Sequence, residues 1–201
     1  MNTYYLKHVS EGFSWDGIPT LTIENIYKGE RHGIEAYAQI AWADDAFHVH
    51  MWTIEPETYA ESKEPFEYPA DDSCLEFFFS PMEETTRYFN IEFNSLGCFF
   101  FGLGTSKEDL IRLVPLKKKD IFSERIIKHE DGWEIFYTVP YELIRRFFNR
   151  FEPFVGKKIR ANCYKCSVKG NYPHYLTWNP NGAVMGSFHN TDIFGEMIFV
   201  D

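Results

Sequence analysis

The sequence predicts an all-β fold, an antiparallel β-sandwich of the immunoglobulin or jelly-roll type, on the strength of three observations. Aromatic residues make up 18% of the chain, and such residues are enriched in strands. Short apolar runs alternate with polar residues at the period of two that half-buried strands show. The 201 residues contain no repeat, low-complexity tract or linker-like stretch, so we expect residues 1–201 to form a single domain.

Nine runs are strand candidates, which is enough for two packed sheets. An acidic turn at Asp44-Asp45 joins two of the strongest runs, and Asp131-Gly132 gives a second hairpin signal before Trp133. Tight turns of this kind connect antiparallel neighbours. The six strong runs are 34–42, 46–54, 75–80, 87–94, 133–139 and 159–168, and the weaker ones are 21–27, 98–103 and 196–200.

One short helix near residues 140–149 is expected to cap an end of the sandwich. Pro140 suits the first helical position. Four apolar residues that follow it form a stripe opposite three arginines, as in an amphipathic helix. The stripe is Leu143, Ile144, Phe147 and Phe148, and the arginines are Arg145, Arg146 and Arg150.

The segment 55–69 is rich in proline and glutamate, which predicts a long mobile loop that leads into the run at 75–80. Phe66 and Tyr68 lie in this loop without a hydrophobic partner pattern. Exposed rings on a loop are candidates for ligand stacking, although such rings also fold back onto the rim of a domain.

The formal net charge of −10 argues against nucleic acid as a partner, because phosphates demand clustered Lys and Arg. One basic run, Lys117 to Lys119, is too short for a binding stripe. No apolar run approaches the ~20 residues that cross a bilayer, and residues 1–15 lack the pattern of a secretory leader. We therefore expect no nucleic acid and no membrane partner, and a cytoplasmic location unless a leader was removed.

Four cysteines, at positions 74, 98, 163 and 166, are too sparse in a domain of this size to indicate a disulfide framework, so free thiols are expected. Cys163-x-x-Cys166 resembles half of a zinc motif. Residues three apart in a strand point to opposite faces, however, so both are interpreted as small buried hydrophobes.

His48, His50 and Trp52 share one face of an alternating run and could line a wet surface or a second binding face. Two imidazoles spaced in this way can reach one cation, but a third ligand would have to come from another part of the chain.

Polar side chains between Asp71 and Gly97 give the strongest functional signal. Asn90, Glu92 and Asn94 fall two residues apart, so in a strand they share one face while the intervening apolar residues share the other. A row of carboxylates and amides beside aromatic rings is what sugar hydroxyls need, and Glu76 in the preceding run could join it.

Ordered landmarks over most of the chain resemble the family 9 carbohydrate-binding module-like group of the wider DOMON-type β-sandwich superfamily. Each landmark is short, and their shared order carries the resemblance. They are Trp15 with Ile18-Pro19, the stretch from Asp72 to Phe78, the stretch from Tyr88 to Asn94 with Gly97, the stretch from Ala161 to Cys166, Pro173-His174-Tyr175, Trp178-Asn179-Pro180, Phe188-His189 and Phe194-Gly195-Glu196.

The resemblance implies a sugar site at one end of the sandwich, where two aromatic rings clamp a terminal sugar and polar side chains hold its hydroxyls. It puts Glu76 and Asn90 at ligand positions of the family. Where characterised modules carry tryptophan, this chain has Tyr68 or Pro69 and Phe188, which is a departure from the family pattern.

A structural calcium ion is also implied by the resemblance. Acidic pairs in expected turns, at 44–45, 71–72 and 83–84, supply the hard oxygen donors that calcium prefers. The sequence has no EF-hand loop, and acidic turns are often simply solvated.

We therefore expect a non-catalytic domain that recognises a mono- or oligosaccharide, such as the end of a sugar chain, and that acts beside a separate glycoside hydrolase. His174 and Trp178 are secondary candidates, and the strand-like context of Trp178 favours a core position. The expected ligand-binding residues are Glu76, Asn90, Glu92 and Asn94 as polar contacts, Tyr68 and Phe188 as stacking rings, and His174 and Trp178.

Two alternatives stay open. Glu76 and Glu92 on neighbouring strands could act as acid and base or nucleophile of a glycoside hydrolase. A haem-carrying redox domain would need axial ligands, for which Met51, Met82, Met185 and seven histidines are available.

Overall fold

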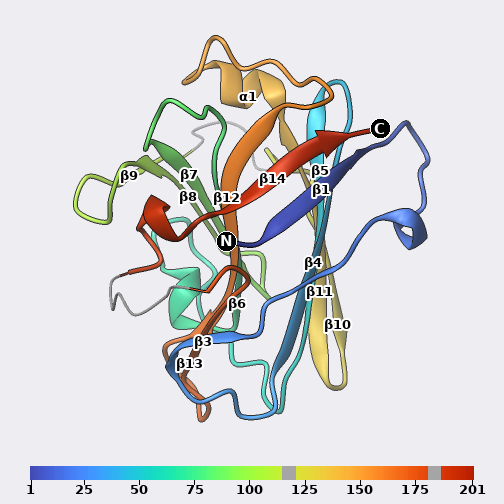
Figure 1. Cartoon of the computed structure of the whole chain (residues 1–201). Coiled ribbons are helices and arrows are strands. Elements are labelled where there is room, and N and C mark those ends of the chain that lie inside the picture. The colour runs from blue at the N-terminus through green and yellow to red at the C-terminus, as the bar shows by residue number, and fades with distance from the viewer. Residues whose placement is uncertain (115–120, 181–186) are drawn as a thin grey trace.

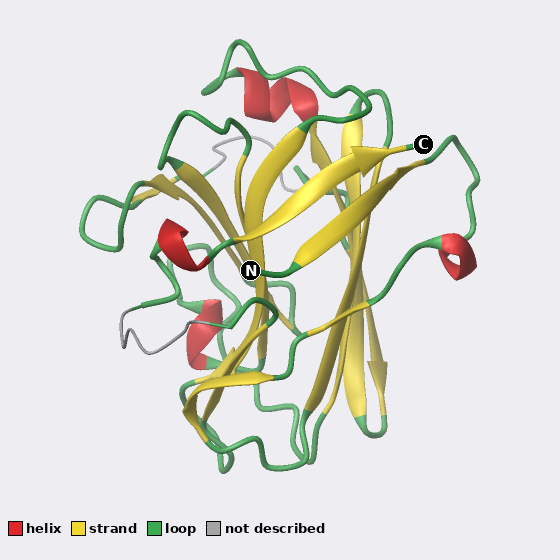
Figure 2. Ribbon diagram, viewed as in Figure 1, coloured by secondary structure: helices red, strands yellow, loops and turns green. Residues whose placement is uncertain are grey.

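The computed structural model describes residues 1–114, 121–180 and 187–201, and the prediction of a mostly β fold is confirmed (Figures 1 and 2). Strands make up 46% of the described residues and helical turns 7%. The strands are β1 Thr3–His8, β2 Leu21–Thr22, β3 Asn25–Gly29, β4 Glu35–Trp42, β5 Ala46–Ile54, β6 Cys74–Ser80, β7 Tyr88–Asn94, β8 Phe99–Gly104, β9 Ile111–Arg112, β10 Arg125–His129, β11 Gly132–Pro140, β12 Lys158–Ser167, β13 His174–Thr177 and β14 Gly195–Val200.

The strands form one continuous sheet that curls into two facing layers. The hydrogen-bonded order is β10-β11-β5-β4-β1-β14-β12-β6-β7-β8-β9, with β2 beside β4 and with β13 between β12 and β3. In Figure 1, β4, β5, β10 and β11 form one layer, β6 to β9 with β12 form the other, and β1 and β14 run between them. The core fills the space between the layers, where the ring centroids of Phe47 and Phe79 are 5.6 Å apart and those of Phe93 and Tyr137 are 5.1 Å apart.

The sheet contains both parallel and antiparallel strand pairs, whereas the sequence predicted antiparallel pairs alone. β1 pairs in parallel with β14 and with β4, whereas the other strand pairs of the described chain are antiparallel. Turn signals report only pairs that are close in sequence. A pair such as Thr3 with Glu196, which joins opposite ends of the chain, leaves no such local sign.

The helix is shorter than the predicted 140–149. α1 spans Tyr141–Arg145 and covers one end of the two layers (Figure 2). Pro140 has extended backbone, because it is the last residue of β11 and pairs with Ala46 of β5. The N–H groups of Phe147 and Phe148 both donate to the carbonyl of Ile144, which ends the helix in a tight turn.

Local patterns located most of the long strands. The runs predicted at 46–54, 75–80 and 87–94 correspond to β5, β6 and β7, and the Asp131-Gly132 turn joins β10 to β11. The weaker run 21–27 is divided between β2 and β3, while β1, β9, β10 and β13 lie in none of the nine predicted runs.

The segment 55–68 has neither helix nor strand, as expected of a loop, and it ends in the 3-10 turn η2 Pro69–Asp71. Two further 3-10 turns are η1 Trp15–Gly17 and η3 Thr191–Ile193. The Lys117 to Lys119 run and Met185 lie outside the described residues. Across the described ranges, no helix has the length and apolar character that a membrane span requires.

Candidate functional site

The polar residues of β6 and β7 lie on the outer face of their layer, because alternation along each strand sends the intervening residues inward. Phe77 and Ile91 belong to the core between the layers. Glu76 and Glu92 face away from that core, and they are direct register partners across the β6–β7 pair. Directly opposite residues have Cβ atoms only about 4.5–5.5 Å apart, so the fold places the two carboxyl groups side by side.

Two adjoining hollows open on this outer face. Their volumes are about 460 Å³ and about 510 Å³, within the range of roughly 300–1,000 Å³ that small-molecule sites occupy. The hollows share four lining residues, Ala70, Glu92, Lys107 and His189. They therefore form one continuous candidate cleft, with Glu92 at the boundary between its two parts.

The first hollow, which is the smaller, has a polar floor and an aromatic wall. Glu76 and Cys166 lie at its floor, from β6 and β12. The wall consists of Tyr27, Tyr175 and Phe188, with centroids 5.2 Å apart for Tyr27 and Phe188 and 6.0 Å apart for Tyr175 and Phe188. The pairing of β13 with both β12 and β3 brings Tyr175 and Tyr27 to this position.

The second hollow has its own pair of rings. Tyr68, which is 61% exposed, lies nearly parallel to Phe100 at a centroid distance of 6.3 Å. The guanidinium of Arg112 sits 4.6 Å from the Phe100 centroid and 5.6 Å from that of Tyr68. It also donates to the carbonyl of Glu67 at 2.7 Å, so a cation–π contact and a backbone hydrogen bond hold Tyr68 at the rim.

Burial is the main cause of the pKa shifts of the carboxyl groups at the floor of the cleft. It raises the pKa of Glu76 well above its ordinary value, and the nearby Cys166 and Glu92 add to the rise. Burial also raises the pKa of Glu92 to about 7, against the opposing influence of the Asn90 amide and Arg112. The pKa of His189 is lowered to about 4 by burial and by Lys107. Its imidazole is therefore neutral near pH 7, with Nδ1 hydrogen-bonded to the Tyr88 hydroxyl at 2.8 Å.

Four of the eight predicted ligand residues line the cleft: Glu76, Glu92, Tyr68 and Phe188. Asn90 is on the same strand face but is fully buried, with its amide beside the Glu92 carboxyl whose pKa it lowers. The structure thus brings the predicted carboxylates and rings together, with Asn90 beneath the surface.

The other three predicted ligand residues lie outside both hollows and are held by the protein. Asn94 donates to the Ser62 carbonyl at 2.8 Å and to Asp72 Oδ2 at 2.7 Å, so it fastens the 55–69 loop. Trp178 is 5% exposed and contacts the ring of Tyr4 edge-on in the core. His174 is buried and is hydrogen-bonded through Nδ1 to a backbone carbonyl. A shared strand face did not suffice for Asn94, because it stands at the end of β7 where the loop covers it.

Sequence reasoning missed several residues of the cleft. The rings come from strands separated by many residues, and their convergence depends on the unpredicted pairing of β13 with β3. The alternation of Phe99, Phe100 and Phe101 was the available signal that one ring of that run faces outward. The residues that were not selected are Tyr27, Tyr175, Phe100, Lys107 and Arg112.

The acidic pairs proposed for calcium do not converge. One member of each pair is bonded to a basic side chain: Asp44 to His8, Asp71 to Lys169 and Glu84 to Arg150. Over the described ranges, the one group of three side chains with metal-ligating atoms close together contains two thiols and a single carboxylate. That is not the all-oxygen set that calcium prefers, so the described acidic pairs do not gather into one carboxylate site, and a structural calcium ion stays a prediction.

The opposite outer face, on β4, β5 and β11, carries the alternating His48, His50 and Trp52. His50 is hydrogen-bonded to Gln39 at 3.1 Å and to Glu134 at 2.7 Å, and it stacks on Phe136 at 4.0 Å. Its two nitrogens are thus both occupied by protein partners. The geometry does not favour His50 as a metal ligand.

Solved structures similar to this chain share its fold. A protein of Bacteroides uniformis, described as a candidate carbohydrate-binding protein, is 23% identical, with a TM-score of 0.82 and 98% of both chains covered. A carbohydrate-binding module of family 9 from Caldicellulosiruptor kristjanssonii, solved with glucose, is 11% identical, with a TM-score of 0.68 over 98% of this chain and 95% of the module. Its structure with cellotriose gives the same identity and TM-score over 99% and 94%.

No protein with a curated description matches this chain. The sequence profile of carbohydrate-binding family 9, however, matches residues 30–199, which include every strand from β4 to the greater part of β14. This match covers far more than half of the sequence and agrees with the fold of the solved modules. The chain therefore belongs to carbohydrate-binding family 9.

Proposed function

We propose that this protein binds a mono- or oligosaccharide in the cleft on the outer face of β6 and β7, and that it does not cleave it. The observation that carries the proposal is the placement of Glu76 and Glu92 side by side at a floor flanked by two separate groups of rings. Membership of family 9, and the glucose and cellotriose complexes of the solved module, support a sugar as the ligand.

The chemistry of the cleft suits a sugar. The apolar face of a pyranose ring can lie on Tyr68 or Phe188, where burial of C–H groups gives affinity. Its hydroxyls can form hydrogen bonds with the carboxyl groups of Glu76 and Glu92 and accept from the ammonium of Lys107. A ligand that lacks these hydroxyls would leave buried polar groups unmatched, at a cost of about 1–3 kcal/mol each.

The two rings proposed to stack on the sugar are arranged differently in the two hollows. Phe188 is packed on Tyr164 at a centroid distance of 4.0 Å and is only 8% exposed, whereas Tyr68 is largely exposed. In this proposal Phe188 forms a fixed platform and Tyr68 closes over the sugar from the rim.

Calorimetric titration with a panel of mono- and oligosaccharides, glucose and cellotriose included, tests the proposal. We expect saturable heat with at least one sugar and roughly tenfold weaker binding in Tyr68→Ala. Tyr5→Ala is the matched control, because Tyr5 is also an exposed tyrosine but lines neither hollow. Absence of heat across the panel, or equal loss in both variants, would contradict the proposal.

The adjacent carboxylates keep glycoside hydrolysis as the alternative, since such enzymes act through a pair of Asp or Glu residues. Chromogenic glycosides separate the two functions. Binding without product supports our proposal, whereas product that disappears in Glu76→Gln or Glu92→Gln would assign the protein to the hydrolases. Action beside a separate glycoside hydrolase stays a prediction.

A further inference from the structure

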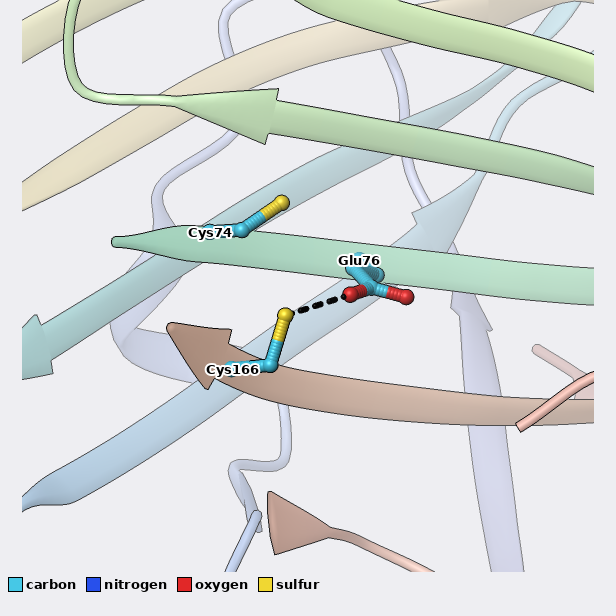
Figure 3. Close-up of side chains that lie close together, drawn as sticks. All are labelled: Cys74, Glu76 and Cys166. Atoms are coloured by element: carbon cyan, nitrogen blue, oxygen red, sulfur yellow. Dashed lines mark hydrogen bonds between the residues drawn. The ribbon is translucent and has the colours of Figure 1, made fainter. Parts of the chain in front are cut away.

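Two cysteines and a glutamate converge at the floor of the first hollow. Cys74 and Glu76 lie on β6, and Cys166 lies on the neighbouring strand β12, where it is the direct register partner of Cys74. Figure 3 shows the sulfur of Cys166 pointing at the Glu76 carboxylate, and this Sγ donates to Oε1 at 3.0 Å. One ligand atom from each of the three residues lies within 4.8 Å of the other two.

These distances are close to those of a tetrahedral zinc site. With Zn–S bonds of about 2.3 Å and Zn–O bonds of about 2.0–2.2 Å, ligand atoms stand roughly 3.4–3.8 Å apart. Side-chain shifts of about 1 Å at most would therefore bring both thiolates and the carboxylate onto one ion. Two sulfurs with one oxygen suit Zn²⁺, which is borderline soft, better than Ca²⁺ or Mg²⁺.

Glu76 also lacks a protein cation. It is 2% exposed, and it forms no ion pair with a described Lys or Arg. Lys165, its neighbour on β12, points to the other face, where its ammonium is 2.9 Å from Glu55 and 3.1 Å from Ser73. An isolated buried carboxylate is unfavourable unless it is paired, coordinates a metal or takes up a proton. A divalent ion would supply a positive charge that no described basic residue supplies to Glu76.

We propose that Cys74, Glu76 and Cys166 bind one Zn²⁺ ion at the floor of the cleft. Glu76 and Cys166 line the first hollow, which provides the entry path. The three protein ligands leave the fourth tetrahedral position directed at the cleft, where it takes a water molecule or an oxygen of a ligand. This site goes beyond saccharide binding and does not depend on it.

Spectroscopy on the reduced, metal-stripped and untagged protein tests the site. We expect one equivalent of Co²⁺ to produce thiolate-to-cobalt charge-transfer absorption, and Zn²⁺ to abolish it by displacement. Cys74→Ser and Cys166→Ser should lose the absorption and weaken Zn²⁺ binding at least about 100-fold, because even residues behind metal ligands change affinity by 10- to 100-fold. Glu76→Gln should keep the absorption, with weaker binding.

Cys163→Ser is the matched control, since Cys163 lies on the same strand and is fully buried but belongs to the core on the opposite face. It should bind both metals like the wild type. If the serine variants do not fold, zinc K-edge X-ray absorption of the wild-type protein decides instead, with two sulfur neighbours at about 2.3 Å expected.

Several results would overturn the zinc site: no charge-transfer absorption in the reduced wild type, absorption that survives in both Cys74→Ser and Cys166→Ser, or a zinc edge without sulfur neighbours. A Cys74–Cys166 disulfide in a protein that takes up no Zn²⁺ after reduction would also overturn it. Sugar titrations of the metal-free and zinc-loaded protein are read separately, so sugar binding and the zinc site can each fail alone.

Discussion

The two outer faces of the sheet look alike in sequence but differ in how their polar groups are bonded. On β5 and β11, His50 and Glu134 bond to each other, and Glu134 also contacts His129 at 3.0 Å. On β6 and β7, Glu76 and Glu92 stand side by side at a hollow without an ion pair to a described basic residue. Alternation places polar residues on a face, but the neighbouring strands decide whether they are satisfied internally or remain for a ligand.

The largest difference between the two faces is expected when one glutamate on each face is replaced by glutamine and saccharide affinity is measured. The pKa of Glu92 is about 7, so its carboxyl is largely ionised above that pH. There we expect Glu92→Gln to lower saccharide affinity by about 10- to 100-fold, because hydrogen bonds to charged groups are worth about 1.5–3 kcal/mol. Glu134→Gln should leave affinity unchanged. Calorimetric titration of both variants makes the comparison, and an equal loss would show that the two faces do not differ in function.

Ring removal should produce a smaller contrast. Tyr68→Ala should weaken saccharide binding by roughly tenfold, in line with the 0.5–1.5 kcal/mol of a good ring contact plus the lost buried area. Trp52→Ala should have no effect, since Trp52 stacks on Tyr37 and His50 on the opposite face. Weaker binding in the Trp52 variant would instead support the second binding face predicted from the sequence.

The pH dependence of stability should have opposite signs on the two faces. Glu92 has a pKa raised from 4.5 to about 7, so folding favours its protonated form and its contribution is lost as the pH rises through that window. Burial lowers the pKa of His50 below 6.5, so its contribution is lost as the pH falls. Melting temperatures between about pH 5 and pH 8 should flatten on the alkaline side in Glu92→Gln and on the acid side in His50→Gln. A slope unchanged by either variant would refute that assignment.

The smallest difference is expected in stability at a fixed pH. Glu134→Leu should cost about 1–2 kcal/mol, because His50 and His129 lose their acceptor. Glu92→Leu should be neutral or stabilising, since it removes a buried carboxyl without breaking an ion pair. Urea unfolding measures both values, and a larger cost for the Glu92 variant would mean that its carboxyl is bonded more firmly than the structure indicates.

Much of the fold could be predicted because period-two alternation is a local property of the chain. The residues of β5, β6 and β7 carry it without interruption, and the outward position of Glu76 and Glu92 follows from it. The site was predictable only in part, because its completion depends on long-range pairing. Tyr27 and Tyr175 become neighbours through β3 and β13, and nothing within either segment indicates the other.

The same limit explains the residues that lie outside the cleft. Asn94 matches Glu92 in spacing, but its amide is taken by Asp72 and Ser62, which arrive from a loop. The cysteines show the converse case. In the sequence, the spacing of Cys163 and Cys166 suggested a pair. In the structure, Cys166 of β12 instead lies directly opposite Cys74 of β6, which is almost a hundred residues away in the chain.

β1 joins the two layers of the sheet. It lies between β4 and β14, with parallel bonds to each, and so fastens the layer that carries the cleft to the layer that backs it. Loss of those few residues would uncover the border of β14 and the end of β4 at Ala41 and Trp42, and exposed strand edges can pair with another molecule. Shortening this end of the chain would therefore favour aggregation well before it altered any residue that lines the cleft.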